Sequence, residues 1–346
     1  MKNLTLFVLL LFGQQVFSQI PSGYYTNANG LNGTPLKTAL YDIIKEHKEF
    51  PYSSSNTDVW DILKETDKDT NNPNNIILLY TGWSVDAAQE YNSGNGWNRE
   101  HVWSKSHGSF GTSMGAGTDV HHLRPSDISV NSAKNSRWFD NCSTPYLDNG
   151  NYTGCFTSST NWVWQPRDEV KGDVARMIFY MATRYEGDSN EPDLEIVDYL
   201  PTDNYTSDPV YSKLSTLLQW HMEDAVDDWE RNRNDIIYYD FQNNRNPFID
   251  HPEYANLIWD LTTATPQNED AHQLKIYPNP IKNYFTIDTE EEVQRVEITD
   301  ITGRVVKNVS ALTEVKTVDC KDFKNGLYIV KVYTEKEVIL SKIIKE

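Results

Sequence analysis

The spacing of apolar residues predicts two helices in the first two thirds of the chain. In PLKTALYDIIKEHKEF the apolar positions recur three or four residues apart, which predicts an amphipathic helix over residues 35–49. In EVKGDVARMIFYMATRYEGD the same period ends before Gly187, which predicts a second helix. We expect His47 on the first helix to be structural, and Met177 and Met181 on the second to pack in the core.

Other stretches of the first unit predict a strand and further helices. The run NNIILLYTGW, residues 74–83, predicts a buried strand because Asn/Pro and Gly turn signals flank a continuous apolar stretch. Residues 212–261 show mixed helical periods, broken at Asn246-Pro247 and His251-Pro252. The first unit, residues 19–261, is therefore predicted to be α+β and helix-rich.

The pattern changes after residue 261. The stretch TTATPQNEDAHQ is polar, lacks large apolar residues and includes a proline, so residues 262–271 are predicted to form a linker. Residues 272–346 then alternate short β-rich runs with turn residues, which predicts a small all-β sandwich. We find no catalytic constellation in this part, and we expect it to address or anchor the protein.

The N-terminus has the pattern of an export signal. Lys2 precedes an apolar run from Leu4 to Phe12, which is too short to cross a membrane as a stable helix. We therefore expect residues 1–18 to be a signal peptide, with the mature chain starting near Gln19. No later stretch approaches 18 uninterrupted apolar residues, so we expect no stable membrane insertion.

Composition supports a globular, exported protein with two folding units in its 346 residues. The 10 Trp, 20 Tyr and 12 Phe predict an aromatic-rich core, because disordered chains are poor in aromatic residues. Cys142 and Cys155 lie 13 positions apart in a loop rich in Gly, Asn and Thr, where both a disulfide and two free thiols are compatible with the sequence. Cys320 is expected to be a buried small hydrophobe.

Charge is distributed unevenly along the chain. A net charge of -19 argues against tight, purely electrostatic binding of nucleic acid. The segment from residue 99 to residue 137, however, contains five cationic residues and four histidines but only three acidic residues. Such a local patch could hold an anionic substrate, more so with a divalent metal ion. The five cations are Arg99, Lys105, Arg124, Lys134 and Arg137.

The stretches NREHVWSKSHGSF and DVHHLRPSDISVNSAKNSR gather the residue types that phosphodiester cleavage needs. An imidazole such as His101 can activate water, and a divalent ion can stabilise the charge that develops on phosphate and leaving group. Magnesium prefers oxygen ligands and keeps several waters, so Glu100 and Asn131 are the available protein ligands. Asn131 is expected on a helix beginning near Ser126.

Strand geometry complicates this hypothesis, because adjacent residues on a strand point to opposite faces. Glu100 and His101 can serve one site if the chain twists or bulges there, or if the metal lies at the strand edge. A zinc site using His101, His107, His121 or His122 is a second possibility. The absence of HExxH and CxxC motifs argues against zinc.

These motifs, together with GDVARMIFYMATRY and WHMEDAVDDWERNRNDIIYYDFQNNRNPFIDHPEY, resemble the bacterial endonuclease I family over residues 25–260. The resemblance implies a ββα-metal core, with His101 as general base and Glu100 and Asn131 as ligands of Mg²⁺, with Mn²⁺ or Ca²⁺ as alternatives. It further implies hydrolysis of DNA, and of RNA too, with little sequence specificity.

The family also positions the phosphate with an arginine, and here the correspondence is incomplete. Arg124 and Arg99 are the nearest substitutes, and the sequence leaves the choice between them open. Lys134 or Arg137, which follow Asn131, are further alternatives. The stretch RNPFID resembles the family's closing motif, and Asn246, Asp250 and the following His251 are expected to fix the shape of the core near the site.

The C-terminal part resembles the sorting domain of the type IX secretion system. The marks are YPNP, TGR, NGLY and a lysine-rich end within residues 272–346. The resemblance implies that the secretion machinery is a partner and that the protein is secreted or attached to the cell surface. A secreted binding or adhesion protein with an inactive nuclease-like unit is the alternative, although all three inferred site residues are present. The oligomeric state stays open.

Overall fold

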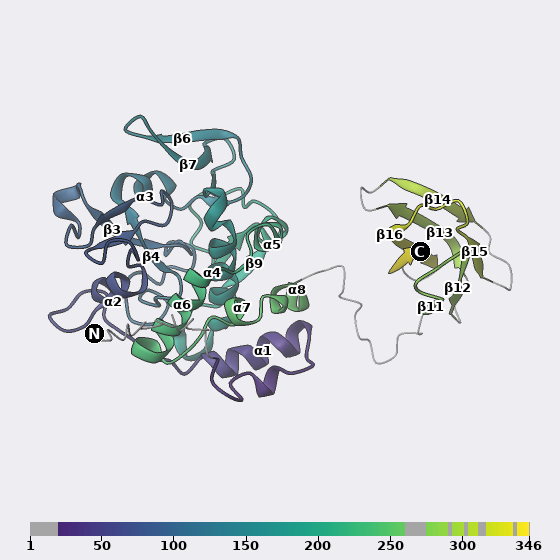
Figure 1. The fold of residues 1–346 in the computed structure, drawn as a ribbon, viewed down its shortest axis with the longest axis horizontal. Helices are drawn as coiled ribbons and strands as arrows, with labels where there is room; N and C mark the ends of the chain where they lie inside the picture. The colour runs from purple at the N-terminus through teal and green to yellow at the C-terminus, as the bar shows by residue number, and fades with distance from the viewer. Residues whose placement is uncertain are drawn as a thin grey trace, which may run out of the picture. The chain divides into compact units, whose positions relative to one another are not determined.

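The computed structural model describes residues 20–259, 275–289, 293–300, 304–310, 316–334 and 338–345. The chain divides into two compact units, Met1–Asp260 and Leu261–Glu346, whose folds are shown in Figure 1. The predicted signal peptide, residues 1–18, and the predicted linker, residues 262–271, lie outside the described residues. Within the described part of the chain, no helix is both long and apolar enough to cross a membrane.

Helices form most of the core of the first unit, as predicted. The helix α4, Lys171–Arg184, is buried from Gly172 to Arg184, as a helix surrounded by other elements must be. Both of its methionines pack in the core. The other helices are α1 (Gly33–Ile44), α2 (Val59–Thr66), α3 (Ile128–Lys134), α5 (Leu214–Glu223), α6 (Asp228–Ile236), α7 (Pro247–Asp250) and α8 (Glu253–Trp259).

The strands of the first unit are short and form several small sheets. The pairs β1–β2 and β3–β4 are antiparallel, β9 and β10 are parallel, and a four-stranded sheet has the order β5-β8-β7-β6. The bounds are β1 (Asn75–Ile77), β2 (Ser84–Asp86), β3 (Trp97–His101), β4 (Leu123–Asp127), β5 (Trp138–Phe139), β6 (Thr144–Asp148), β7 (Asn151–Ser158), β8 (Val163–Gln165), β9 (Glu195–Val197) and β10 (Val210–Ser212).

The strand predicted over residues 74–83 is wrong in its length. Only Asn75–Ile77 is a strand, and the chain then turns, because Gly82 N donates to Leu78 O at 2.8 Å with Gly82 at φ 68°. Leu79 N donates instead to the carbonyl of Pro125 at 2.9 Å. The apolar run therefore indicates that these residues are buried. It does not indicate whether the buried backbone forms a strand or a turn.

Two smaller expectations have clear outcomes. The first helix ends at Ile44, earlier than predicted, and His47 follows it with its ring buried. Arg184 Nε donates to its Nδ1 at 3.1 Å, so His47 has the structural environment expected.

Cys142 and Cys155 are free thiols, and the sulfur of Cys155 donates to the carbonyl of Tyr80 at 3.1 Å. The disulfide alternative is therefore not what the structure shows.

The second unit is all-β, as predicted. Two sheets, in the orders β11-β12-β15 and β14-β13-β16-β17, share one apolar core that contains Cys320. The alternation of apolar and polar residues places one face of each sheet in that core. The strands are β11 (Lys275–Tyr277), β12 (Tyr284–Asp288), β13 (Val293–Asp300), β14 (Val305–Ser310), β15 (Thr317–Asp319), β16 (Gly326–Thr334) and β17 (Val338–Lys345).

Candidate active site

The strands β3 and β4 and the helix α3 form a ββα unit that carries the predicted site residues. β3 pairs with β4 so that Glu100 lies opposite Arg124 and His101 opposite Leu123. The helix α3 follows β4 directly, because Asp127 caps it by accepting hydrogen bonds from two amides of its first turn. The Ser-Asp start expected from the sequence is therefore confirmed, and α3 presents Asn131 beside β3.

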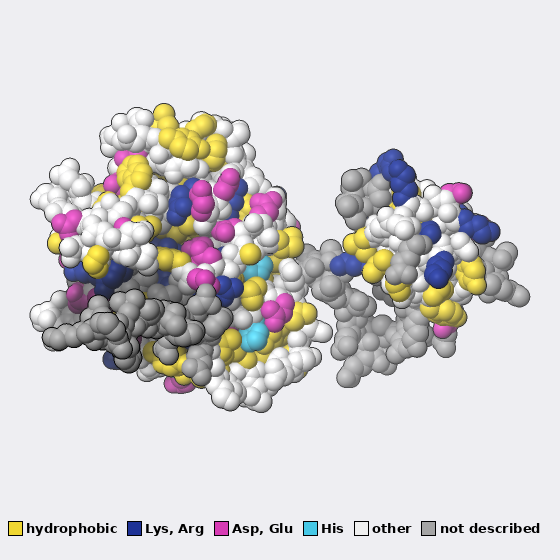
Figure 2. All heavy atoms as spheres, in the orientation of Figure 1, with side chains coloured by type: hydrophobic (Ala, Val, Ile, Leu, Met, Phe, Trp, Pro, Cys, Tyr) yellow, Lys and Arg dark blue, Asp and Glu magenta, His cyan; other side chains and the backbone are white. Residues whose placement is uncertain are grey.

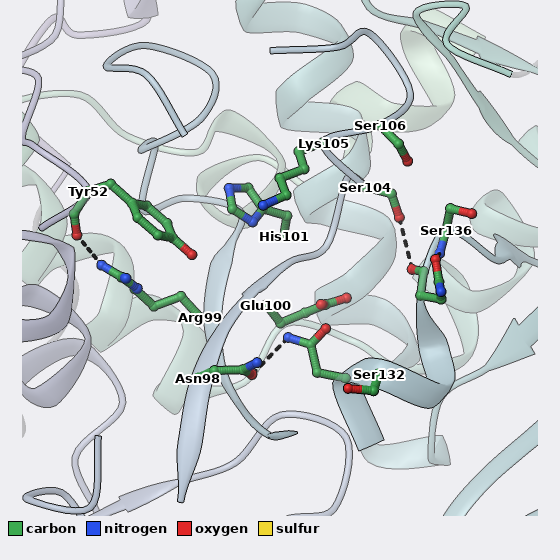
Figure 3. Close-up of a pocket in the computed structure, with 12 residues that line it drawn as sticks. Tyr52, Asn98, Arg99, Glu100, His101, Ser104, Lys105, Ser106, Ser132 and Ser136 are labelled. Atoms are coloured by element: carbon green, nitrogen blue, oxygen red, sulfur yellow. Dashed lines mark hydrogen bonds between the residues drawn. The ribbon is translucent and has the colours of Figure 1, made fainter. Parts of the chain in front are cut away.

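Side chains alternate along β3, and one pocket reaches both of its faces. Arg99 and His101 lie on the side of Tyr52, whose ring stacks on His101 at 5.7 Å between centroids. Asn98 and Glu100 point to the other side of the strand (Figure 3). A pocket of about 400 Å³ is lined by all four residues and by Asn131. β3 pairs with β4 along one edge, and among the described residues its other edge forms one isolated bridge, between Trp97 and Glu90. A metal at the strand edge stays a prediction.

The ring of His101 is held in one tautomer. Its Nε2 lies 3.0 Å from the carbonyl oxygen of Gly117, and a carbonyl oxygen only accepts, so Nε2 carries the proton. The described residues give Nδ1 no hydrogen bond, which leaves its lone pair available. Burial lowers the pKa of His101 well below 6.5. The imidazole is therefore neutral at pH 7, as a general base must be.

Glu100 is buried but has polar partners. Tyr80 donates its hydroxyl proton to Glu100 Oε1 at 2.8 Å, and the ammonium of Lys134 lies 3.3 Å from the same oxygen. Burial raises the pKa of Glu100 above 4.5. These partners hold one carboxylate oxygen, Oε1, in place, and the carboxylate lines the pocket.

The amide of Asn131 is oriented by its neighbour on β3. Its Nδ2 donates to the side-chain oxygen of Asn98 at 2.8 Å. The orientation of an amide is assigned from such contacts, and this one leaves Asn131 Oδ1 as an oxygen donor for a ligand in the pocket. A carboxylate oxygen, an amide oxygen and an imidazole nitrogen thus line one pocket.

The first unit matches the model of a known family, Endonuclease I, over residues 32–253. The chain belongs to this family. It is 55% identical over 239 residues to "Extracellular ribonuclease" of Bacillus subtilis (strain 168), covering 68% of this chain and 78% of that relative. It is 54% identical over 237 residues, with the same coverage, to "Extracellular ribonuclease" of Bacillus amyloliquefaciens.

The second unit matches the model of the secretion system C-terminal sorting domain over residues 275–346. A solved structure of PorZ from Porphyromonas gingivalis is 22% identical and covers 24% of this chain and 12% of its own, with a TM-score of 0.19, too low to support an argument. The protein is therefore a nuclease of the endonuclease I family with a type IX sorting domain, and it is secreted or attached to the cell surface.

Arg124, one of the two arginines considered for positioning the phosphate, lies outside the pocket. The side chain is 2% exposed and does not line the pocket. Its Nε donates to Asp67 Oδ1 at 2.6 Å, a second guanidinium nitrogen donates to Asp173 at 3.3 Å, and the guanidinium lies over the ring of Trp229. The structure gives Arg124 the role of a buried ion-pair partner, and a phosphate in the pocket would not meet it.

The other cations considered from the sequence also have partners. Arg99 lines the pocket, but its guanidinium lies 3.4 Å from the ring centroid of Tyr52 and donates to Ser53 Oγ at 3.1 Å. Lys134 is buried beneath Glu100. Arg137 lies over the ring of Trp162 and does not line the pocket.

The remaining histidines of the nuclease do not assemble a zinc site. His107 stacks on Trp138 and contacts two backbone carbonyls, His121 contacts the backbone of Asn244, and His122 contacts the carbonyl of Ala116. Within the described residues, no group of three or more His, Cys, Asp or Glu side chains could hold a metal ion. A closed zinc site needs four such ligands, so the zinc alternative finds no support.

The closing motif shapes the core, as expected. Asn246 caps α7 by accepting a hydrogen bond from Phe248 N at 3.0 Å. Asp250 accepts hydrogen bonds from Arg245 Nε at 2.6 Å and from the hydroxyl of Tyr25 at 2.7 Å. His251 also lies outside the pocket, where it contacts the carboxylate of Glu253 at 3.2 Å.

Sequence reasoning did not assign three residues that shape the pocket. Asn98 lies two positions before Glu100, so the period of a strand could have placed both on one face. Lys105 lies four positions after His101 and was counted only as one of several charges. Tyr52 lies far away in the sequence, and no local signal indicates its contact with His101.

Proposed function

We propose that the first unit hydrolyses phosphodiester bonds in DNA and RNA with the help of one Mg²⁺ ion. The observation that carries this proposal is the tautomer of His101. Its Nε2–H is fixed on the carbonyl of Gly117, which leaves Nδ1 as the proton acceptor, and the residue lines a pocket that also contains Glu100 and Asn131. General-base catalysis needs a neutral imidazole near the metal-binding oxygens.

The donors present fit magnesium. Glu100 offers a carboxylate and Asn131 an amide oxygen to the same pocket, and Mg²⁺ commonly binds one or two protein oxygens and keeps several waters. A bound ion would supply positive charge to the phosphate and to the leaving oxygen. Mn²⁺ or Ca²⁺ could occupy the same oxygen donors.

The protein's own residues would activate and orient the attacking water. His101 Nδ1 accepts the proton of the water, and the ring then becomes an imidazolium. The carbonyl of Gly117, already bonded to Nε2–H, stabilises that charge, and the stacked ring of Tyr52 limits rotation. Tyr80 and Lys134 keep Glu100 in a fixed orientation.

The proposed substrate range follows from the pocket and from the relatives. The pocket is lined by hydroxyl, amide and charged groups that suit a phosphate, and no set of them reads a base edge identifiably. Both relatives carry the name extracellular ribonuclease, which supports RNA as a substrate. We therefore propose cleavage of RNA and DNA with little sequence specificity.

The test uses supercoiled plasmid and a long RNA, each with Mg²⁺ or with chelator. Wild-type protein is expected to cleave both only with Mg²⁺, and His101→Ala is expected to lose activity with its fold intact. Glu100→Gln is expected to need more Mg²⁺. His251→Ala is the matched control, because that histidine lies outside the pocket. Wild-type activity in His101→Ala would exclude this base, and an inert wild-type protein would favour the binding-protein alternative.

A further inference from the structure

The side chain of Lys105 occupies an unusual position among the charges of the pocket. It lies in the turn-rich segment after β3, is exposed, and lines the pocket. Figure 3 shows its ammonium reaching toward His101. The described residues give this ammonium no hydrogen bond and no ion pair. An exposed lysine without a partner keeps its three donors free for a ligand.

The four other cations of residues 99–137 are already engaged. Arg124 and Lys134 are buried against carboxylates. Arg99 and Arg137 each lie over an aromatic ring and donate to backbone carbonyls. Lys105 is therefore the cation of this segment that can meet a phosphate without breaking an existing contact.

The electrostatic setting favours such a cation. The chain carries a net charge of -19, and acids and bases are interspersed on the face of the first unit shown in Figure 2. A bound Mg²⁺ would be partly neutralised by Glu100. Attack by water adds negative charge to the phosphate, so a further positive group at the pocket favours the transition state over the bound substrate.

We propose that the ammonium of Lys105 binds the phosphate at which this nuclease cleaves. The inference rests on the proposed function and names the cation that the sequence left open. A lysine presents a compact charge without the fixed fork of an arginine, so it can follow phosphates held at different angles. This property fits cleavage of both RNA and DNA.

The experiment compares Lys105→Gln and Lys105→Arg with the wild-type protein. Lys45→Gln is the matched control, because Lys45 follows the end of α1, outside the pocket, and its loss changes the net charge equally. The first measurement is kcat/KM on RNA and plasmid across Mg²⁺ concentrations. The second is the affinity for a short single-stranded oligonucleotide in chelator at several salt concentrations, which does not depend on cleavage.

Lys105→Gln is expected to lower kcat/KM about 10- to 100-fold, the worth of one hydrogen bond to a charged group, with the Mg²⁺ concentration for half-maximal rate unchanged. The slope of the logarithm of its binding constant against the logarithm of the salt concentration should be smaller by about 0.7, the value expected for the loss of one phosphate contact with a single strand. Lys105→Arg should recover most of both. The inference is overturned if Lys105→Gln behaves like Lys45→Gln, or if Lys105→Arg loses as much activity as Lys105→Gln.

The two readouts separate this inference from the proposed function. If wild-type protein cleaves with Mg²⁺ but Lys105→Gln binds and cleaves normally, the lysine assignment fails alone. If no variant cleaves but Lys105→Gln still loses one phosphate contact in chelator, the proposed function fails and the lysine contact stands.

Discussion

His122 is expected to make the nuclease unit less stable as the pH falls, and His122→Gln should remove part of that loss. The ring is fully buried, and its Nε2–H donates to the carbonyl of Ala116 at 2.9 Å. Its Nδ1 has no hydrogen-bond partner among the described residues, so a second proton there would have no acceptor. Burial lowers the pKa of His122 to about 4.

The sign follows from the protons bound by each state. The unfolded chain binds a proton on this ring near pH 6.5, whereas the folded chain binds it only near pH 4. The stability from neutral His122 is therefore present above pH 6.5 and is lost as the pH falls through 4. Between pH 7 and pH 4.5 the loss amounts to roughly 2 kcal/mol.

The assay is urea unfolding at both pH values, followed by tryptophan fluorescence. All 10 tryptophans lie between residues 60 and 259, so the signal reports the nuclease unit alone. Gln can still donate to Ala116 but does not titrate, and carboxylates that titrate in both proteins cancel in the comparison. His251→Gln, which replaces a partly exposed histidine, is the control. Equal losses in the wild-type protein and in His122→Gln would refute the reasoning.

Two further predictions concern the site and its surroundings. Because burial lowers the pKa of His101, kcat/KM at saturating Mg²⁺ should still be level at pH 6.5 and should decline only at a pH well below that; a decline centred at or above pH 6.5 would contradict this. Arg124→Ala should lower the free energy of unfolding by about 3 kcal/mol, because it breaks two buried ion pairs and leaves Asp67 and Asp173 with only the more distant Arg233 and Arg176. The folded variant should keep its kcat/KM, and a catalytic loss with normal unfolding would instead indicate a phosphate contact.

The sequence predicted helices better than strand lengths. The period of α4 is long and appears in one continuous segment, so local spacing identifies it. The apolar run 74–83 predicted a long strand, but only Asn75–Ile77 pairs. The difference arises because Leu78, Leu79 and Tyr80 are buried through a turn. An apolar run in the sequence indicates burial, whereas the path of the backbone depends on hydrogen-bond partners distant in sequence, such as the carbonyl of Pro125.

The sequence allowed the base and the metal ligands of the candidate site to be predicted, but not the cation that is free to contact a phosphate. Glu100, His101 and Asn131 line one pocket, and their nearness in sequence to one strand and one helix made this expectation possible. The cations were harder, because counting Lys and Arg cannot separate a buried ion-pair partner from a free charge. Arg124 pairs with Asp67, which lies 57 positions earlier, and nothing in the local sequence indicates that contact.

The two units, the helical period of the core and the residue types available for phosphodiester chemistry could be predicted from short segments of the chain. Which groups are free to act depends on the folded structure. It fixed the tautomer of His101 through Gly117, and it occupied Arg124 with distant carboxylates while leaving Lys105 unpaired. The reason is that protonation, burial and pairing depend on neighbours in space, and folding alone brings those neighbours together.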